Sequence, residues 1–372
     1  MAFLAKPNLK SAVRKNIRLS SPLESSGDIV TEAIMNIALN RFSLALAASL
    51  LSATALAGSA SAQDEGLVVY NAQHESLGRE WIDAFTKETG IKVTMRQGSD
   101  MQFANQIIQE GDASPADVFL TENSPAMTLV DGAGLFAPIE KETLDQVPEQ
   151  YRPADGMWTG IAARTTVFAY DKTKLTEDKL PKSLLDLADP AWKGRWGAAP
   201  AGADFQAIVA ALLQLKGEQS TADWLKGLKD NATPYKGNSV AMKAVNAGEV
   251  EGAVIYHYYW FGDQAKTGEN SKNVGLHYFK NQDPGAFVSV SGGGVLKSTQ
   301  HMKEAQAFLK FLTSKAGQAI LKDGTSYEYA IGKDAPSNDK LTPLADLNAP
   351  KVEASTLDSK KVVELMTAAG LI

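Results

Sequence analysis

The chain has 372 residues and a formal net charge of -6 at pH 7, with 44% hydrophobic and 22% charged residues. These values exclude a disordered or fibrous protein and predict two domains of ordinary size. No basic cluster follows the first 18 residues, which argues against a nucleic-acid partner. Cysteine is absent, which excludes a disulfide framework, a thiolate metal site and a lipid anchor on cysteine.

The first predicted segment is a secretory signal peptide. Arg41 precedes the apolar run at residues 42–56, and Ala60-Ser61-Ala62 forms a small-residue cleavage site. The apolar run is too short for a transmembrane helix, which needs about 20 apolar residues. We therefore expect cleavage after Ala62 and a soluble product in the periplasm.

The start of the leader has two interpretations. Residues 1–62 are predicted to be leader and signal peptide, and Met35 lies at the usual distance upstream of the apolar run for an initiator. Residues 1–34 are therefore either an unusual leader or an extension from a start codon assigned too early. The sequence leaves Met1 and Met35 as alternative initiators.

After the signal peptide, the chain alternates between strand and helix patterns. The predicted elements are a strand at 67–70, a helix from 77 to 89, a strand at 91–95, a helix from 99 to 111, a strand at 117–121 and a helix beginning at Ser124-Pro125. His74 and Glu122 follow the first and third strands. Because parallel strands end at one edge of a sheet, both side chains are expected at that edge. Taken alone, either is more often an ordinary polar or solvated side chain.

The second half of the chain predicts further crossings between strands and helices. The expected elements are a strand at 165–170, a small-residue loop at 198–203, a helix at 205–215, a helix at 240–247 capped by Asn238-Ser239, and strands at 253–255, 275–279 and 287–290. A chain that leaves one lobe near residue 165 and returns near residue 280 crosses twice, which permits hinge closure on a ligand.

Two adjacent phenols follow the strand predicted at 253–255. Tyr258 and Tyr259 precede a short helix expected at 261–266, and the amino end of a helix favours anions. A tyrosine there can become a phenolate, a hard oxygen donor, if a cation is present. The alternative is that the aromatic residues simply fill a half-buried strand.

Five runs in the mature chain resemble the periplasmic ferric-ion-binding proteins of iron ABC transporters. These runs are Val69 to His74, Ala116 to Glu122, Lys236 to Val240, Tyr258 to Trp260 and Gln282 to Ala286. The resemblance covers essentially all of the mature chain, in the family's order. It implies a type II periplasmic binding fold with two α/β lobes and an interlobe cleft. Lobe 1 is expected at residues 63–164 and 280–340, and lobe 2 at 165–279 and 341–372.

The same resemblance implies the metal ligands. In that family, iron is held by a histidine and a glutamate from one lobe and two adjacent tyrosines from the other, which correspond here to His74, Glu122, Tyr258 and Tyr259. A synergistic anion or water completes the shell around Fe³⁺. The donor chemistry agrees, because two phenolates and one carboxylate balance three positive charges. Zinc would recruit cysteine or several histidines, and calcium several carboxylates and carbonyls.

The anion pocket matches the family less well. Arg164 and Asn238 agree with it, and Gly202 and Ala203 stand where phosphate-binding members carry part of a Ser-Gly-Ala run. Asp204 continues that loop, and Tyr256 replaces an asparagine. If Asp204 faces the cleft, it repels phosphate, and the group that completes the iron shell is then carbonate, a carboxylate or water. The alternative is that Asp204 caps the helix that begins at Phe205.

The resemblance implies a monomeric binding protein, without enzymatic activity, that delivers iron to an inner-membrane ABC permease. One alternative is a binding protein for an oxyanion, an organic phosphonate or a polyamine. Another is a secreted metal-dependent hydrolase, which needs an open coordination position and a positioned base. Glu75 is the nearest base to His74, but it begins a helix and is expected to face solvent.

Overall fold

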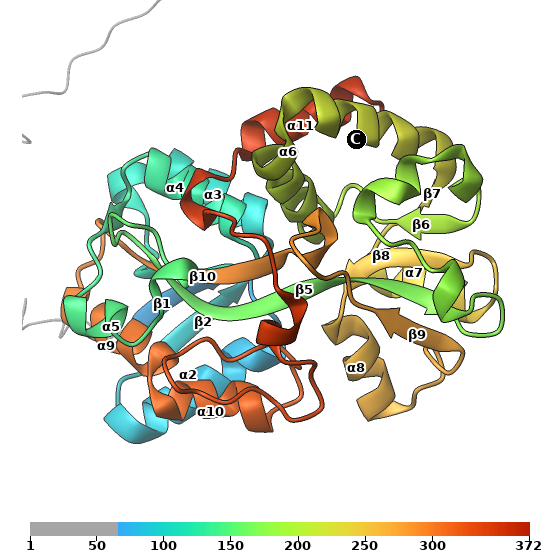
Figure 1. Ribbon diagram of the computed structural model, residues 1–372. Helices are drawn as coiled ribbons and strands as arrows, with labels where there is room; N and C mark the ends of the chain where they lie inside the picture. Colours follow the sequence, from blue (N-terminus) through green and yellow to red (C-terminus); the bar gives the residue numbers. More distant parts are fainter. Residues whose placement is uncertain (1–65) are drawn as a thin grey trace, which may run out of the picture. The chain divides into compact units, whose positions relative to one another are not determined.

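The computed structural model describes residues 66–372 (Figure 1). The predicted signal peptide and its cleavage site lie outside these residues. No helix in the described part is both long enough and apolar enough to cross a membrane. The strands are β1 (Leu67–Asn71), β2 (Val93–Gln97), β3 (Val118–Leu120), β4 (Phe136–Ala137), β5 (Thr159–Asp171), β6 (Trp196–Ala198), β7 (Ala232–Pro234), β8 (Gly252–Tyr256), β9 (Val274–His277) and β10 (Val288–Leu296).

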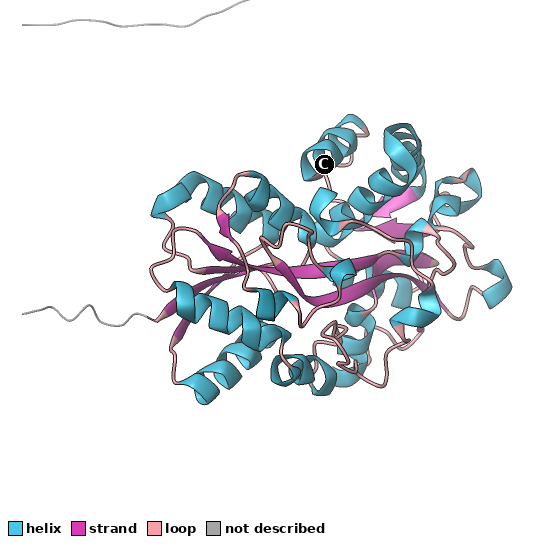
Figure 2. Cartoon of the chain, turned by 60° about the vertical axis from the view of Figure 1, so that its left-hand side comes forward, coloured by secondary structure: helices cyan, strands magenta, loops and turns pink. Residues whose placement is uncertain are grey.

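Helices cover both faces of the sheet that these strands form (Figure 2). They are α2 (Glu75–Thr89), α3 (Asp100–Glu110), α4 (Ser124–Gly132), α5 (Lys141–Leu144), α6 (Ala203–Asn231), α7 (Asn238–Asn246), α8 (Tyr258–Lys266), α9 (Met302–Thr313), α10 (Lys315–Asp323) and α11 (Ser359–Ala368). The observed architecture is therefore the mixed α/β fold that the alternating sequence pattern predicts.

The strand order is β2-β1-β3-β10-β5-β8-β6-β7, with β4 beside β10 and β9 beside β5. β5 joins the two halves of this sheet, because residues 159–165 pair with β10 and residues 166–170 pair with β8. The chain passes from the first half to the second along β5 and returns through β10. In the described chain, the sheet is continuous between the halves through β5, which pairs with β10 in the first half and with β8 and β9 in the second.

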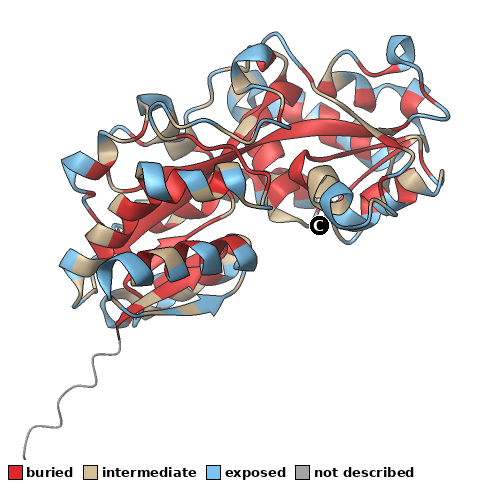
Figure 3. Ribbon diagram, turned by 90° about the horizontal axis from the view of Figure 1, so that it is seen from below, coloured by how far each residue is buried: buried red, intermediate tan, exposed pale blue. Residues whose placement is uncertain are grey.

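Each half of the sheet has its own packed core on either face. In the first half, α2, α9 and α10 cover one face and α3 and α4 the other. In the second half, α6 and α7 cover opposite faces, and α11 packs against α6. Figure 3 shows buried residues concentrated along the strands and the inward faces of the helices. The exact lobe boundaries stay a prediction.

The predicted bounds of α6 and α7 were wrong. The helix expected at residues 205–215 runs from Ala203 to Asn231, passing a non-helical Gly217 with φ 79°. Leu212 before this glycine and Leu225 after it lie in the same core, so packing extends the helix beyond the predicted end. The helix expected at 240–247 begins at Asn238, after Gly237. The Asn238 side chain makes no cap because it donates to a carboxylate elsewhere.

Candidate metal centre

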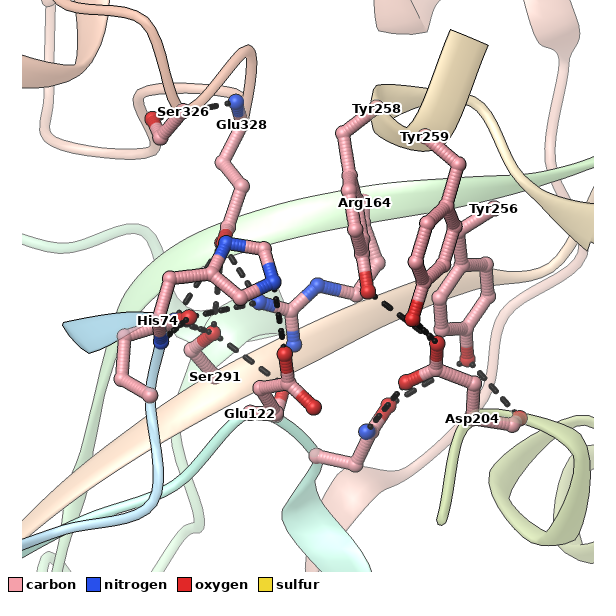
Figure 4. Close-up of polar contacts among 12 residues, drawn as sticks. His74, Glu122, Arg164, Asp204, Tyr256, Tyr258, Tyr259, Ser291, Ser326 and Glu328 are labelled. Atoms are coloured by element: carbon pink, nitrogen blue, oxygen red, sulfur yellow. Dashed lines mark hydrogen bonds and ion pairs between the residues drawn. The ribbon is translucent and has the colours of Figure 1, made fainter. Parts of the chain in front are cut away.

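His74 and Glu122 lie together at one edge of the first half of the sheet (Figure 4). β1 and β3 are adjacent and parallel, so the residues that follow them emerge side by side, as predicted. The Nε2 atom of His74 lies 2.6 Å from Oε1 of Glu122. Both side chains are partly exposed, which leaves this pair accessible from the cleft.

Tyr258 and Tyr259 face this pair from the second half of the sheet. The helix that was expected to begin at residue 261 starts at Tyr258, so the two phenols form its first turn instead of preceding it. The Tyr258 ring centroid lies 4.6 Å from that of His74. The structure therefore brings all four predicted ligands together; that they bind a metal stays a prediction.

Asp204 is the acceptor on which both tyrosines converge. The hydroxyls of Tyr258 and Tyr259 each donate to Oδ2 of Asp204 at 3.0 Å, and Nδ2 of Asn238 donates to the same oxygen at 2.8 Å. The prediction that Asp204 caps its helix was wrong. Gly202 is the N-cap of α6, and the Asp204 carboxylate, in the first turn, is buried against the tyrosines.

Asn123 and Tyr256 complete the surroundings of Asp204. Nδ2 of Asn123, which directly follows Glu122, donates to Oδ1 of Asp204 at 3.0 Å. The buried hydroxyl of Tyr256 lies 3.3 Å from both Oδ1 of Asn123 and the carbonyl oxygen of Asp204. The two hydrogen bonds of Asn123 cross directly between the two halves of the sheet at the site.

The residues predicted to bind an anion have partners within the protein. Arg164, on β5, is fully buried and donates from Nη2 to Oε2 of Glu328 at 2.5 Å. Asn238 donates to Asp204, as described above. Gly202 and Ala203 form the N-cap and first residue of α6. In this conformation, a protein carboxylate contacts each of the two side chains that were expected to hold an anion, while Nε and Nη1 of Arg164 have no hydrogen-bond partner among the described residues.

Glu328 is a buried charged residue that sequence reasoning missed. Its Oε1 atom lies 3.2 Å from Nδ1 of His74, so the imidazole sits between Glu122 and Glu328. Glu328 follows α10 in a segment with no recognisable motif. The one available signal was an acidic residue between two aromatic ones, Tyr327 and Tyr329, in a chain region otherwise rich in polar residues.

Burial and neighbouring charges keep protons on the metal-free site. Burial raises the pKa of Tyr258 and Tyr259, and the carboxylates of Asp204 and Glu122 raise it further. Burial lowers the pKa of His74, but its contacts with Glu122 and Glu328 outweigh this and raise the pKa to about 10. The phenolates expected at a helix amino terminus therefore need a cation to form.

Asp204 has a raised pKa for a related reason. Burial, followed by the nearby charge of Glu122, raises the pKa of Asp204 to about 6, although Arg164 opposes the shift. At neutral pH, Asp204 is therefore mostly ionised and close to its titration range. A cation that binds there would favour the ionised form.

A cavity of about 950 Å³ opens beside the tyrosines and His74. Its lining includes Arg79 from α2 and Lys243 from α7, so both halves of the sheet contribute to its wall. The cavity gives a solute a route to His74, Tyr258 and Tyr259, which line it. Glu75, also on its wall, begins α2 and bonds to Arg79 as an exposed pair, so it is not a base held toward His74.

The chain matches the family model described as "Bacterial extracellular solute-binding protein" over residues 113–354. It is 64% identical over 318 residues to an Fe(3+)-binding periplasmic protein of Serratia marcescens, covering 86% of this chain and 94% of the relative. It is 40% identical over 308 residues to the major ferric iron-binding protein of Neisseria meningitidis serogroup B, covering 82% and 93%.

Solved structures agree with these sequence matches. Iron-bound HitA from Pseudomonas aeruginosa aligns with a TM-score of 0.78 and 45% identity, covering 82% of this chain and 99% of that one. The ferric binding protein from Campylobacter jejuni aligns with a TM-score of 0.75 and 25% identity, with the same coverage.

Two α/β halves joined by crossing strands, with converging side chains between them, define a type II periplasmic binding protein. The sequence matches named above are to binding proteins rather than enzymes. The chain belongs to the family of bacterial extracellular solute-binding proteins.

Proposed function

We propose that this protein is exported to the periplasm, captures Fe³⁺ between its two lobes and delivers it to an inner-membrane ABC permease. It acts as a monomer and has no enzymatic activity. The observation that carries the proposal is that the His74–Glu122 pair and the Tyr258–Tyr259 pair face each other, with the ring centroids of His74 and Tyr258 4.6 Å apart. The names of the bacterial relatives support ferric iron as the cargo.

The donor set suits a hard trivalent cation. Tyr258, Tyr259 and Glu122 supply three negative charges when deprotonated, and the neutral imidazole of His74 adds a nitrogen donor. Asp204 lies within 3.0 Å of both phenol oxygens and supplies a further anionic oxygen. Because that oxygen already adds a fourth negative charge, we propose that Asp204 takes the place of an anion and that water completes the shell.

The test of iron capture uses protein recovered from a periplasmic extract, whose intact mass also reports whether cleavage follows Ala62. After removal of bound metal, addition of ferric citrate should produce a visible phenolate-to-iron charge-transfer band. A colourless protein at saturating iron would contradict the proposed function. A mass that retains residues 1–62 would contradict export by cleavage.

The Asp204 assignment predicts a changed anion requirement. In the native protein, phosphate should have little effect on iron affinity. Asp204→Ser removes one anionic oxygen, so affinity without phosphate should fall by roughly 100-fold, equivalent to about 2.7 kcal/mol. Added phosphate should restore part of that loss, because the serine leaves space and the Asn238 amide is freed to donate.

The measurement is chelator competition with and without phosphate, and the matched control is Asp223→Ser, an exposed aspartate on the same helix. The control should bind iron as the native protein does. If Asp204→Ser keeps native affinity in phosphate-free buffer, Asp204 is not a ligand. If the native protein itself needs phosphate, the proposed anion substitution is wrong.

A further inference from the structure

Glu328 is a fully buried carboxylate that contacts two other groups of the site. Oε2 accepts from Nη2 of Arg164 at 2.5 Å, and Oε1 lies 3.2 Å from Nδ1 of His74. Burying a charge is costly unless it is paired and hydrogen-bonded. Arg164 supplies the opposite charge, and this leaves Glu328 free to act as an ionised acceptor for His74.

The contact with Glu328 determines which nitrogen His74 presents to the cleft. A neutral imidazole carries one N–H and one free lone pair, and only the lone pair can bind a metal. Ionised Glu328 and Glu122 can only accept hydrogen bonds, so both nitrogens of His74 carry protons in the metal-free site. When a metal binds, Nε2 gives up its proton, and Nδ1 keeps the proton that faces Glu328. Nε2 then points toward Glu122, 2.6 Å away, on the side where Tyr258 lies.

A second histidine holds the Glu328 turn in place. The backbone N–H of Thr165 donates to Nδ1 of His257 at 3.2 Å, so Nε2 of His257 carries the proton and donates to the carbonyl of Tyr327 at 2.7 Å. Tyr327 has a φ of 54°, in the left-handed region that non-glycine residues rarely adopt. Such a conformation persists where its surroundings enforce it.

This turn connects the two ligand pairs through the middle of the sheet. His257 directly precedes Tyr258, and Tyr329 forms a β-bridge with Ala163, next to Arg164 on β5. The turn that orients His74 is thus fixed by β5 and by His257, the residue that directly precedes the tyrosine helix α8. A buried frame of this kind can hold a metal ligand in a fixed direction while the two halves move.

We propose that Glu328 is a positioning residue that selects the Nδ1–H tautomer of His74 and directs its Nε2 toward the ferric ion, with Arg164 as its counterion. The inference rests on the proposed function and adds a residue beyond the predicted ligands. Glu328 does not touch the metal. Its effect on iron is transmitted through the His74 imidazole alone.

The first test is a double-mutant cycle in the full mature protein. Glu328→Gln should lower ferric affinity about 10- to 100-fold, the usual cost of losing a partner behind a metal ligand. The amide can offer either an oxygen or an NH₂ group to His74 and so no longer selects one tautomer. His74→Ala with Glu328→Gln should bind like His74→Ala alone, because Glu328 acts only through the imidazole.

The second test reads the tautomer directly. The chain contains four histidines, so ¹⁵N-labelled imidazoles can be assigned by single replacements. With Ga³⁺ as a diamagnetic probe of the same charge, His74 should show a protonated Nδ1 and a metal-bound Nε2. In Glu328→Gln that pattern should weaken or reverse, which a general loss of packing would not produce.

The matched control is Glu251→Gln, which alters an Arg195–Glu251 pair away from the site. It should leave affinity and the His74 spectrum unchanged.

If Glu328→Gln does not fold, Glu328→Asp keeps the charge beside Arg164 and withdraws it from His74, with the same expected loss of ferric affinity. Failure of the native protein to bind iron would overturn the proposed function. Native iron binding with an unchanged variant, additive losses in the cycle, or Ga³⁺ on Nδ1 would overturn this inference alone.

Discussion

Replacement of Tyr258 or Tyr259 by phenylalanine is expected to lower ferric affinity at least roughly 1,000-fold, equivalent to about 4 kcal/mol. Each change removes one anionic oxygen from the donor set and keeps the ring. Both rings belong to or pack against the core of the second half of the sheet, so folding should change little. The lost hydrogen bond to Asp204 should cost about 1 kcal/mol of stability, since Asn123 and Asn238 still donate to that carboxylate.

His74→Ala should cost less iron affinity than either tyrosine change. Imidazole is a neutral donor, and water can replace it without altering the charge balance around a trivalent ion. We expect a loss on the order of 10- to 100-fold. Competition with a chelator gives affinity, and thermal unfolding gives stability. Tyr170→Phe, on β5 in the second half of the sheet, is the matched tyrosine control; equal losses in all three site variants would contradict the ranking.

The two ligand pairs could be predicted from sequence because each depends on a local rule. His74 and Glu122 directly follow adjacent parallel strands, and such strands deliver their next residues to one edge of a sheet. Tyr258 and Tyr259 are consecutive, so one strand end positions both. Neither local pattern places one pair relative to the other. The expectation that both pairs form one site came from the family resemblance.

Asp204 and Glu328 show where local rules fail. Asp204 precedes an apolar run and has the signature of a helix cap, but two phenols and two amides from elsewhere in the chain provide it with better partners than its own backbone. Glu328 reaches the site from a turn more than 250 residues after His74. Its partner Arg164 lies on β5, which pairs with β10. These two strands are far apart in the sequence, so no local pattern around Arg164 predicts that it is buried.

Lowering the pH is expected to release iron steeply, because the raised pKa values mean that the metal-free site holds protons which the metal must displace. At neutral pH these protons are on Tyr258, Tyr259 and His74, whose pKa values are all raised. Binding should therefore expel about three protons, and affinity should fall about 1,000-fold per pH unit between roughly pH 7 and 8.5. An imidazole with an ordinary pKa of about 6.5 would be mostly neutral in this range and would give a shallower dependence.

Asp204 should steepen this dependence in mild acid. Its pKa in the metal-free protein is raised to about 6, so below that pH the metal must displace a fourth proton. Lower pH weakens iron binding through Asp204 as it does through the tyrosines, since a raised pKa favours the protonated, metal-free form. Asp204→Ser should lose this extra steepness and keep the dependence at higher pH. Chelator competition across a pH series, corrected for the chelator's own titration, gives the slope.

Loss of iron should also permit the two halves to separate. His74 and Glu122 contact each other within the first half, and the tyrosines donate to Asp204 within the second. After protonation, each of these side chains therefore has a hydrogen-bond partner in its own half of the sheet. Around Asp204, the direct bonds between the halves are then those of Asn123. Solution scattering of the samples used for the pH titration should show a more open particle as the colour disappears. Colour that persists into strong acid, a slope near one proton, or an identical particle with and without iron would contradict this coupling of protonation, release and opening.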